Sequence, residues 1–179
     1  GMPAISEGRV VAVGMGGVTV CIDLRSGRKV WEREVGGTAG AWISGRWVFL
    51  VTSEEQLACL GRDDGRVRWV TDIAPPATGR RRPLPRAQWA PPIIAGGQLY
   101  IAGAAGQMLT VNPTTGEVTG RRSVSSGVAF QPAIIGDTML IATNNATLIA
   151  LRGGGGARPA AAATAPAAAA PEAAPPPEG

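Results

Sequence analysis

The amino-acid sequence predicts an all-β fold made of repeated four-stranded antiparallel sheets. The first observation is a motif whose cysteine, glycine and tryptophan recur with a shift of 38 residues, as Cys21, Gly27, Trp31 and Cys59, Gly65, Trp69. The second is that short runs rich in valine, isoleucine and leucine alternate with Gly, Asn or Asp turns, as in β-hairpins. No run along residues 1–152 shows helical periodicity, so strands are the repeating element.

Two more copies of the motif follow along the chain. The third, at 110–120, keeps the turn glycine Gly116 at a shift of 51 from Gly65. The extra length is a loop insertion at 74–86, which is dense in proline and lacks apolar periodicity. The fourth copy begins at Leu148 and is cut short by a glycine run that starts at Gly153. Upstream of the motifs, a phrase of two short strands recurs at 3–13, 41–51, 92–102 and 132–142.

Four antiparallel strands repeated about every 40 residues are typical of a β-propeller blade. The sequence therefore predicts a partial β-propeller over residues 1–152, with blades at about 3–35, 41–73, 90–124 and 130–152, the last incomplete. Residues 153–179 are almost entirely Gly, Ala and Pro. Such a composition cannot build a core, so we expect a disordered tail there.

Six residues of the repeat are predicted to have structural roles: Asp23, Gly27, Trp31, Gly65, Trp69 and Gly116. The glycines are expected to close the hairpins between third and fourth strands, where a left-handed backbone costs glycine little. The tryptophans lie in the fourth strands and are expected to cover the space between neighbouring blades, each ring burying on the order of 200 Å².

The net charge of +4 comes mainly from arginine and is too mild to indicate a nucleic-acid-binding protein. One cluster stands out in the loop insertion: Arg80, Arg81, Arg82 and Arg86. The cluster is either a solvated loop or a contact for an acidic partner, nucleic acid or anionic lipid, and it is a candidate partner loop.

The segment at 22–31, Ile-Asp-Leu-Arg-Ser-Gly-Arg-Lys-Val-Trp, matches the phrase x-x-D-x-x-[ST]-G-x-x-x-W of the quinoprotein-like (PQQ-like) propeller repeat. Within that superfamily, residues 1–152 resemble the last four blades of the BamB family, including the segments at 125–132 and 147–152. The resemblance implies half of an eight-bladed ring. It also implies a non-enzymatic scaffold that docks on the POTRA domains of BamA at the periplasmic face of the outer membrane. The family is held there by an N-terminal lipid anchor, which we do not expect in this sequence.

An enzyme is not expected. The chain has no histidine, the usual general base and commonest metal ligand. The rival interpretation is a fragment of a PQQ-dependent dehydrogenase, which would need vicinal cysteines and a calcium site. Cys21 and Cys59 are not vicinal, and acids such as Asp63 fall at hairpin turns. The other alternative is an unrelated propeller adaptor. No cofactor or metal is expected for this adaptor or for the BamB-like scaffold.

Cys21 and Cys59 occupy equivalent positions in neighbouring blades, so we expect buried free thiols rather than a disulfide. No opening segment resembles an export signal, and no stretch has the ~20 apolar residues of a membrane span. We therefore expect a chain that begins within a longer ring. Its end blades would expose apolar faces, to be covered by a missing propeller half or by self-association.

Overall fold

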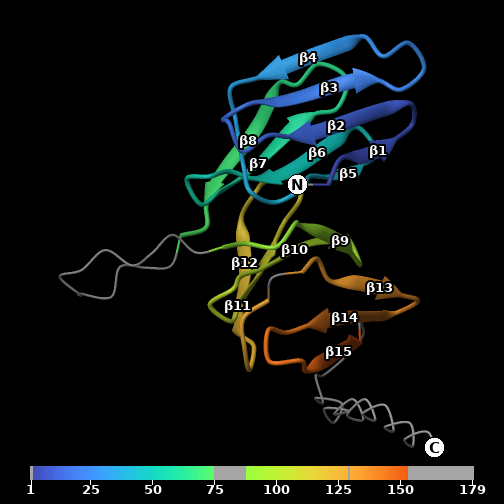
Figure 1. The fold of residues 1–179 in the computed structure, drawn as a ribbon. Helices are drawn as coiled ribbons and strands as arrows, with labels where there is room; N and C mark the ends of the chain where they lie inside the picture. Colours follow the sequence, from blue (N-terminus) through green and yellow to red (C-terminus); the bar gives the residue numbers. More distant parts are fainter. Residues whose placement is uncertain (1, 75–87, 129, 153–179) are drawn as a thin grey trace, which may run out of the picture.

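The computed structural model describes residues 2–74, 88–128 and 130–152, which form fifteen strands in four antiparallel sheets (Figure 1). We call the sheets blades 1 to 4. Blade 1 holds β1 (Ala4–Ser6), β2 (Arg9–Val13), β3 (Thr19–Asp23) and β4 (Lys29–Arg33), and blade 2 holds β5 (Trp42–Ser44), β6 (Trp47–Val51), β7 (Gln56–Gly61) and β8 (Val67–Asp72). Blade 3 holds β9 (Ile93–Ala95), β10 (Gln98–Ala102), β11 (Gln107–Val111) and β12 (Val118–Ser123), and blade 4 holds β13 (Ala133–Ile135), β14 (Thr138–Ala142) and β15 (Leu148–Arg152).

Each blade is a meander in which strands adjacent in sequence are also adjacent in the sheet. The equivalent hairpins repeat the same register, because Val11 of β2 pairs with Cys21 of β3 as Phe49 of β6 pairs with Cys59 of β7. The ladder between the third and fourth strands carries a bulge after each of these cysteines. A bulge increases the local twist, and sheets that stack around a common axis need that twist.

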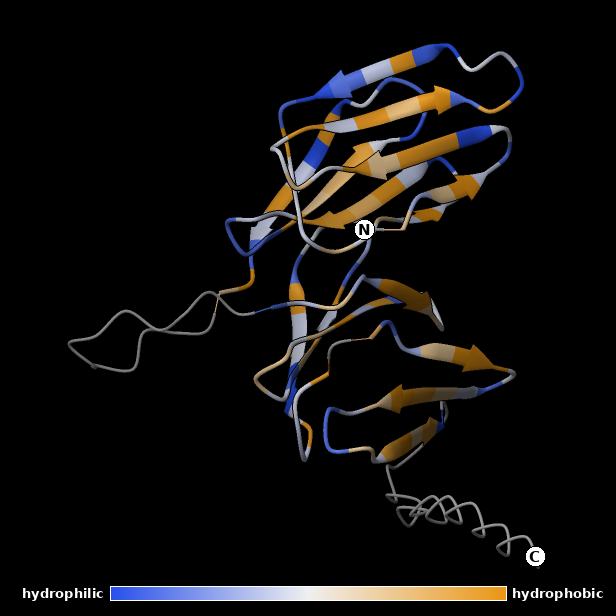
Figure 2. Ribbon diagram, in the orientation of Figure 1, coloured by the Kyte–Doolittle hydropathy of each residue, from blue (hydrophilic) through white to orange (hydrophobic). Residues whose placement is uncertain are grey.

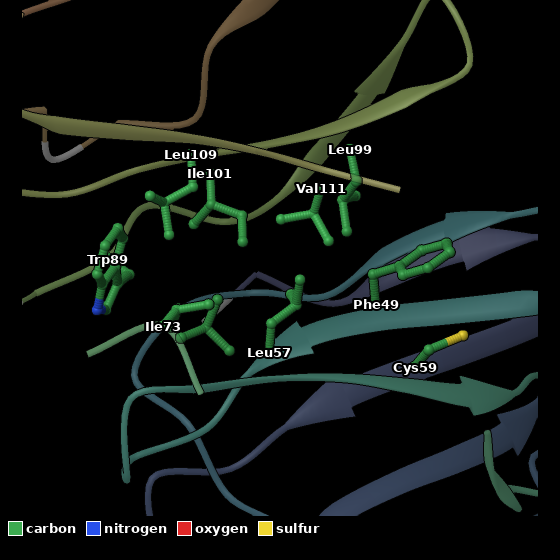
Figure 3. Close-up of a cluster of buried hydrophobic side chains, with 10 residues drawn as sticks. Phe49, Leu57, Cys59, Ile73, Trp89, Leu99, Ile101, Leu109 and Val111 are labelled. Atoms are coloured by element: carbon green, nitrogen blue, oxygen red, sulfur yellow. The ribbon is translucent and has the colours of Figure 1, made fainter. Parts of the chain in front are cut away.

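The blades stack face to face, and the core lies in the layers between them. Figure 3 shows the layer between blades 2 and 3, where Phe49 and Leu57 approach Leu99, Ile101 and Val111 of the next sheet. Blade 2 has a neighbour on each side, so β6 and β7 are buried along almost their whole length. Their nearly continuous apolar sequence follows from burial on two faces.

The first strands gather on one side of the stack, where β1 lies beside β5 and β5 beside β9 (Figure 1). The fourth strands lie on the opposite, outer side and are more hydrophilic, as the blue colour of β4 shows in Figure 2. This arrangement confirms the predicted fold class, an all-β partial β-propeller whose last sheet has three described strands. Within the ranges given above, no helix is long and apolar enough to cross a membrane.

Candidate interaction surface

The hairpins between third and fourth strands have one geometry in blades 1, 2 and 3. The N–H of the turn glycine donates to the carbonyl four residues earlier, at distances of 2.9, 2.8 and 2.8 Å for Gly27, Gly65 and Gly116. All three glycines have positive φ, from 63° to 78°. A side chain at such a φ is strained, which explains why the motif places glycine there.

In each of these turns, a side-chain oxygen accepts a hydrogen bond from a backbone N–H group of the turn. Asp23 Oδ1 accepts from the N–H and the hydroxyl of Ser26 at 2.9 and 2.8 Å, and Asn112 Oδ1 fills the same role in blade 3. Blade 2 has Gly61 at that position, and its acceptor is Asp64 instead. A Cβ on Gly61 would lie 2.1 Å from Asp64 Oδ1, so the glycine makes room for the displaced carboxylate.

Trp31 covers the hairpin of the next blade rather than its own. Its indole Nε1 donates to the carbonyl of Arg62 at 2.6 Å, and its ring lies on Gly65. A Cβ on Gly65 would lie 2.6 Å from Cδ2 of the Trp31 ring, well inside van der Waals contact. The glycine is therefore required both by its backbone angle and by the ring above it.

Trp69 repeats this contact one blade further along. Its Nε1 donates to the carbonyl of Pro113 at 3.1 Å, and its ring lies on Gly116. The third copy has Gly120 at the tryptophan position, so this position supplies no ring to the layer between the described parts of blades 3 and 4. A different bond joins those blades, from the Gln131 side-chain amide to the carbonyl of Pro92 at 2.8 Å.

Five charged residues form a network across blades 1 and 2, which we call the polar cluster: Glu7, Arg9, Asp23, Arg62 and Asp63. Arg9 contacts Asp23 at 2.7 Å and Asp63 at 3.5 Å, while Arg62 pairs with Asp63 at 3.2 Å and also with Glu7. The bonds from Ser26 keep the pKa of Asp23 below its usual value, and the bond from Arg62 does the same for Asp63. Both carboxylates are therefore charged at neutral pH.

The two cysteines are free and buried, as expected. Burial raises the pKa of Cys21, and it raises the pKa of Cys59 to about 12. A thiol with so high a pKa is a poor nucleophile and a poor metal ligand. Within the part of the chain that the structure describes, no group of three or more His, Cys, Asp or Glu side chains is placed to hold a metal ion.

The remaining candidate binding features lie on exposed loops and strand edges. One basic and aromatic feature lies at the edge of blade 2, where the guanidinium groups of Arg46 and Arg68 lie 5.9 and 5.3 Å from the Trp47 ring centroid. The candidate partner loop, Arg80, Arg81, Arg82 and Arg86, lies outside the described residues. Of the six predicted repeat residues, the structure places Trp31 with Gly65 and Trp69 with Gly116, and it places Asp23 in the polar cluster.

The polar cluster was not predicted from the sequence. Asp23 was identified only as a turn residue, and Asp63 was expected to bond its own turn like other hairpin acids. The structure pairs Asp63 with Arg9 and Arg62 instead. The only sequence signal was that an arginine or an acid occupies each of these positions, which does not predict pairing across blades.

Comparisons with known proteins identify the fold and its relatives. A family model described as "PQQ_2: Outer membrane protein assembly factor BamB" matches residues 1–71. BamB of Yersinia pestis is 27% identical over 149 residues, which are 83% of this chain and 35% of that protein. BamB of Escherichia coli K12 is 24% identical over 150 residues, covering 83% of this chain and 36% of that protein. The chain therefore spans about a third of the length of these relatives.

Solved structures give the same fold. The crystal structure of BamB from Moraxella catarrhalis superposes with a TM-score of 0.63 at 18% identity, covering 84% of this chain and 44% of that one. The computationally designed Ika4 protein superposes with a TM-score of 0.65 at 12% identity, covering 85% of this chain and 89% of that one. At these identities the structures establish the fold alone.

Proposed function

We propose that this chain, which is similar to BamB along its blades, is a non-enzymatic scaffold. In this proposal it supports the assembly and insertion of β-barrel proteins into the outer membrane. The observation that carries the proposal is the similarity to BamB proteins over 83% of the chain, together with a stack of blades in the same fold. In this proposal the chain acts at the periplasmic face of the outer membrane and docks on the POTRA domains of BamA.

The geometry supports docking rather than chemistry. The described thiols are buried, and the pKa of each is raised. The carboxylates of Asp23 and Asp63 have lowered pKa values and are paired with arginine. A general base near neutral pH needs the opposite shift, so neither carboxylate is suited to proton transfer.

Contacts between blades 1 and 2 fix the conformation of their loops, and a fixed loop surface favours binding of a partner. Trp31 fixes the hairpin of blade 2, and the polar cluster ties the first turn of blade 1 to Arg62. Loops held by a rigid scaffold lose little entropy on binding, which favours affinity. We include the Arg80 to Arg86 loop in the proposal as an electrostatic contact for an acidic surface of the partner.

The test is direct binding of the 179-residue chain to immobilised BamA POTRA domains, measured by biolayer interferometry. We expect saturable binding, weakened by salt and by substitution of Arg80, Arg81, Arg82 and Arg86 with alanine. A control replaces Arg121 and Arg122, two exposed arginines of β12, and is compared with a variant that replaces only Arg81 and Arg82, so that each loses two charges; the control should bind like the parent chain. No binding at low salt would refute docking on BamA, and equal effects of the two sets of substitutions would refute the loop contact.

A second experiment separates the scaffold from the dehydrogenase alternative. The chain is titrated with pyrroloquinoline quinone in the presence of Ca²⁺ while the cofactor absorbance is recorded. The scaffold proposal predicts no saturable spectral change. A saturable change with defined stoichiometry would favour a cofactor-binding protein.

A further inference from the structure

Blade 2 carries two arginines around one indole ring, and we call this group the basic aromatic site: Arg46, Trp47 and Arg68. The guanidinium carbons lie 5.9 and 5.3 Å from the centroid of the Trp47 ring. Arg46 belongs to the turn between β5 and β6, and Arg68 lies near the start of β8. Both arginines are exposed, whereas the indole is partly buried and packs on the core between blades 2 and 3. Two positive charges therefore lie in solvent beside a ring that the core holds in place.

Two local features of the sheet bring Arg68 to the ring. Trp47 pairs with Gly61 across β6 and β7, and a glycine has no side chain that could cover the indole. The ladder between β7 and β8 is bulged after Cys59, and Arg68 is the residue of β8 that the bulge leaves without a partner. A bulge redirects a side chain relative to the regular strand. Arg68 therefore reaches the Trp47 ring across the space that Gly61 leaves.

Blade 1 fills the equivalent place with carboxylates of the chain itself. Arg9 is the first residue of β2 as Trp47 is of β6, and Arg9 pairs across the ladder with Asp23 as Trp47 does with Gly61. The Arg9 guanidinium contacts Asp23 at 2.7 Å and Asp63 of the next blade at 3.5 Å. A guanidinium at this place in blade 1 is thus bound by two carboxylates.

The corresponding positions around the basic aromatic site are not acidic. The counterpart of Asp23 is Gly61, and the counterpart of Asp63 in the next blade is Thr114, by the same shift of 51 that relates the turn glycines. The repeat therefore keeps the positive charge at this place in blade 2 and omits the two carboxylates that bind it in blade 1.

The two arginines have no anionic partner among the described residues. Neither guanidinium forms an ion pair or donates a hydrogen bond there, and each has the indole as its recorded contact. Asp63 is already bound by Arg62 at 3.2 Å. The hydrogen bond from Arg62 is the main cause of the lowered pKa of Asp63, and the charge of Arg46 only adds to it.

We propose that the basic aromatic site binds an acidic peptide segment of a partner protein, with one carboxylate on each guanidinium. The ion pairs of Arg9 show which ligand a guanidinium takes at this place of the repeat. A cation–π contact uses none of the N–H groups of arginine as a hydrogen-bond donor, so both guanidiniums keep their donors for bidentate pairs with carboxylates. The ring also holds the two arginines near each other before the partner arrives, which reduces the entropy lost on binding.

This inference goes beyond the proposed function and does not depend on it, because an acidic segment of any partner would satisfy the site. Binding to BamA and binding of an acidic peptide are measured separately, so either can fail alone.

The first test uses a fluorescein-labelled peptide in which Asp and Glu alternate with Gly and Ser. Its fluorescence anisotropy is measured as the 179-residue chain is added at low salt. We expect saturable binding, and no binding of the same peptide with Asn and Gln in place of the acids. Replacing Arg46 and Arg68 with glutamine should raise the Kd about 10-fold or more, because two ion pairs are lost. An unchanged Kd in this variant would overturn the proposal.

Two further variants separate a defined site from attraction by net charge. Arg121→Gln with Arg122→Gln removes two exposed arginines of β12, and this matched control should bind the peptide like the parent chain. Arg46→Lys with Arg68→Lys keeps the charge but loses the planar fork, so it should still weaken binding. An equal loss in the β12 control would refute a site. If phosphatidylglycerol vesicles bound through Arg46 and Arg68 and the peptide did not, a lipid headgroup would replace the acidic peptide and the proposal would be wrong.

A second readout reports on the ring itself. The chain has five tryptophans and hence five indole resonances in a ¹H–¹⁵N spectrum, and Trp47→Phe identifies one of them by its absence. The Trp47 resonance should shift saturably as the acidic peptide is added. The resonances of Trp31 and Trp69 should not, because their Nε1 atoms are bound to backbone carbonyls between blades. A peptide that binds without shifting the Trp47 resonance would show that it binds elsewhere.

Discussion

Replacing Gly65 with alanine tests the contact between blades 1 and 2 at a single atom. The new methyl group would lie 2.6 Å from Cδ2 and 2.8 Å from Cε3 of the Trp31 ring. Gly27 is the matched control, since it occupies the equivalent turn with a φ of 69° against 63° for Gly65. A Cβ on Gly27 meets nothing within 4 Å.

Gly65→Ala and Gly27→Ala both lose stability through the strained backbone of alanine at positive φ, but only Gly65→Ala also loses stability through overpacking. Alanine in the left-handed region costs about 1–2 kcal/mol, partly offset by the smaller entropy of the unfolded chain. At Gly65 the ring must also move by about 1 Å to reach normal contact distance, and overpacking of this kind costs about 1–3 kcal/mol. We therefore expect the free energy of unfolding to fall about 1–3 kcal/mol further for Gly65→Ala than for Gly27→Ala.

The assay is urea denaturation followed by circular dichroism at one fixed protein concentration, because self-association would make stability depend on concentration. In a Trp31→Leu background the ring is absent, so the extra cost of Gly65→Ala should disappear, which a double-mutant cycle measures. Equal costs for the two glycine variants in the parent chain, or an unchanged difference after removal of Trp31, would refute the contact.

Three other predictions follow from the charged and sulfur-bearing side chains. Burial raises the pKa of Cys59 to about 12 and also raises that of Cys21, so both thiols should react with a thiol reagent at pH 8 only after the chain unfolds. Rapid labelling of the native chain would contradict this. Asp23 and Asp63 have folded-state pKa values below their unfolded ones, so the stability they contribute is present above about pH 4 and lost as the pH falls through the folded values. Replacing both with asparagine should flatten the acid limb of a stability-against-pH curve, and an unchanged limb would count against the pairing. Arg62→Met should lower the free energy of unfolding by about 0.5–1 kcal/mol, because partly exposed ion pairs are weak. Salt screens such pairs, so the stability of the variant should depend less on salt concentration than that of the parent chain, which thermal melts at low and high salt measure.

The sequence alone predicted the parts of this protein that are local along the chain. The positions of the hairpins follow from their turn glycines, Gly27, Gly65 and Gly116, because a left-handed turn depends on only a few consecutive residues. The repeated apolar runs likewise determined the strands and the stacking of sheets, because a face of valine and isoleucine must be buried against another face. The burial of Cys21 and Cys59 followed from their place in those runs.

The contacts between blades depended on the tertiary structure. Nothing local distinguishes Val10 from Val48, yet Val10 is partly exposed and Val48 is fully buried, because the stacking order places blade 1 against the side of blade 2 that carries Val48. The pairing of Arg62 with Glu7, and of the Trp31 ring with Gly65, depends on the rotation of one sheet relative to the next. That rotation arises from the twist of whole sheets, so residues far apart in sequence meet only after the blades have formed.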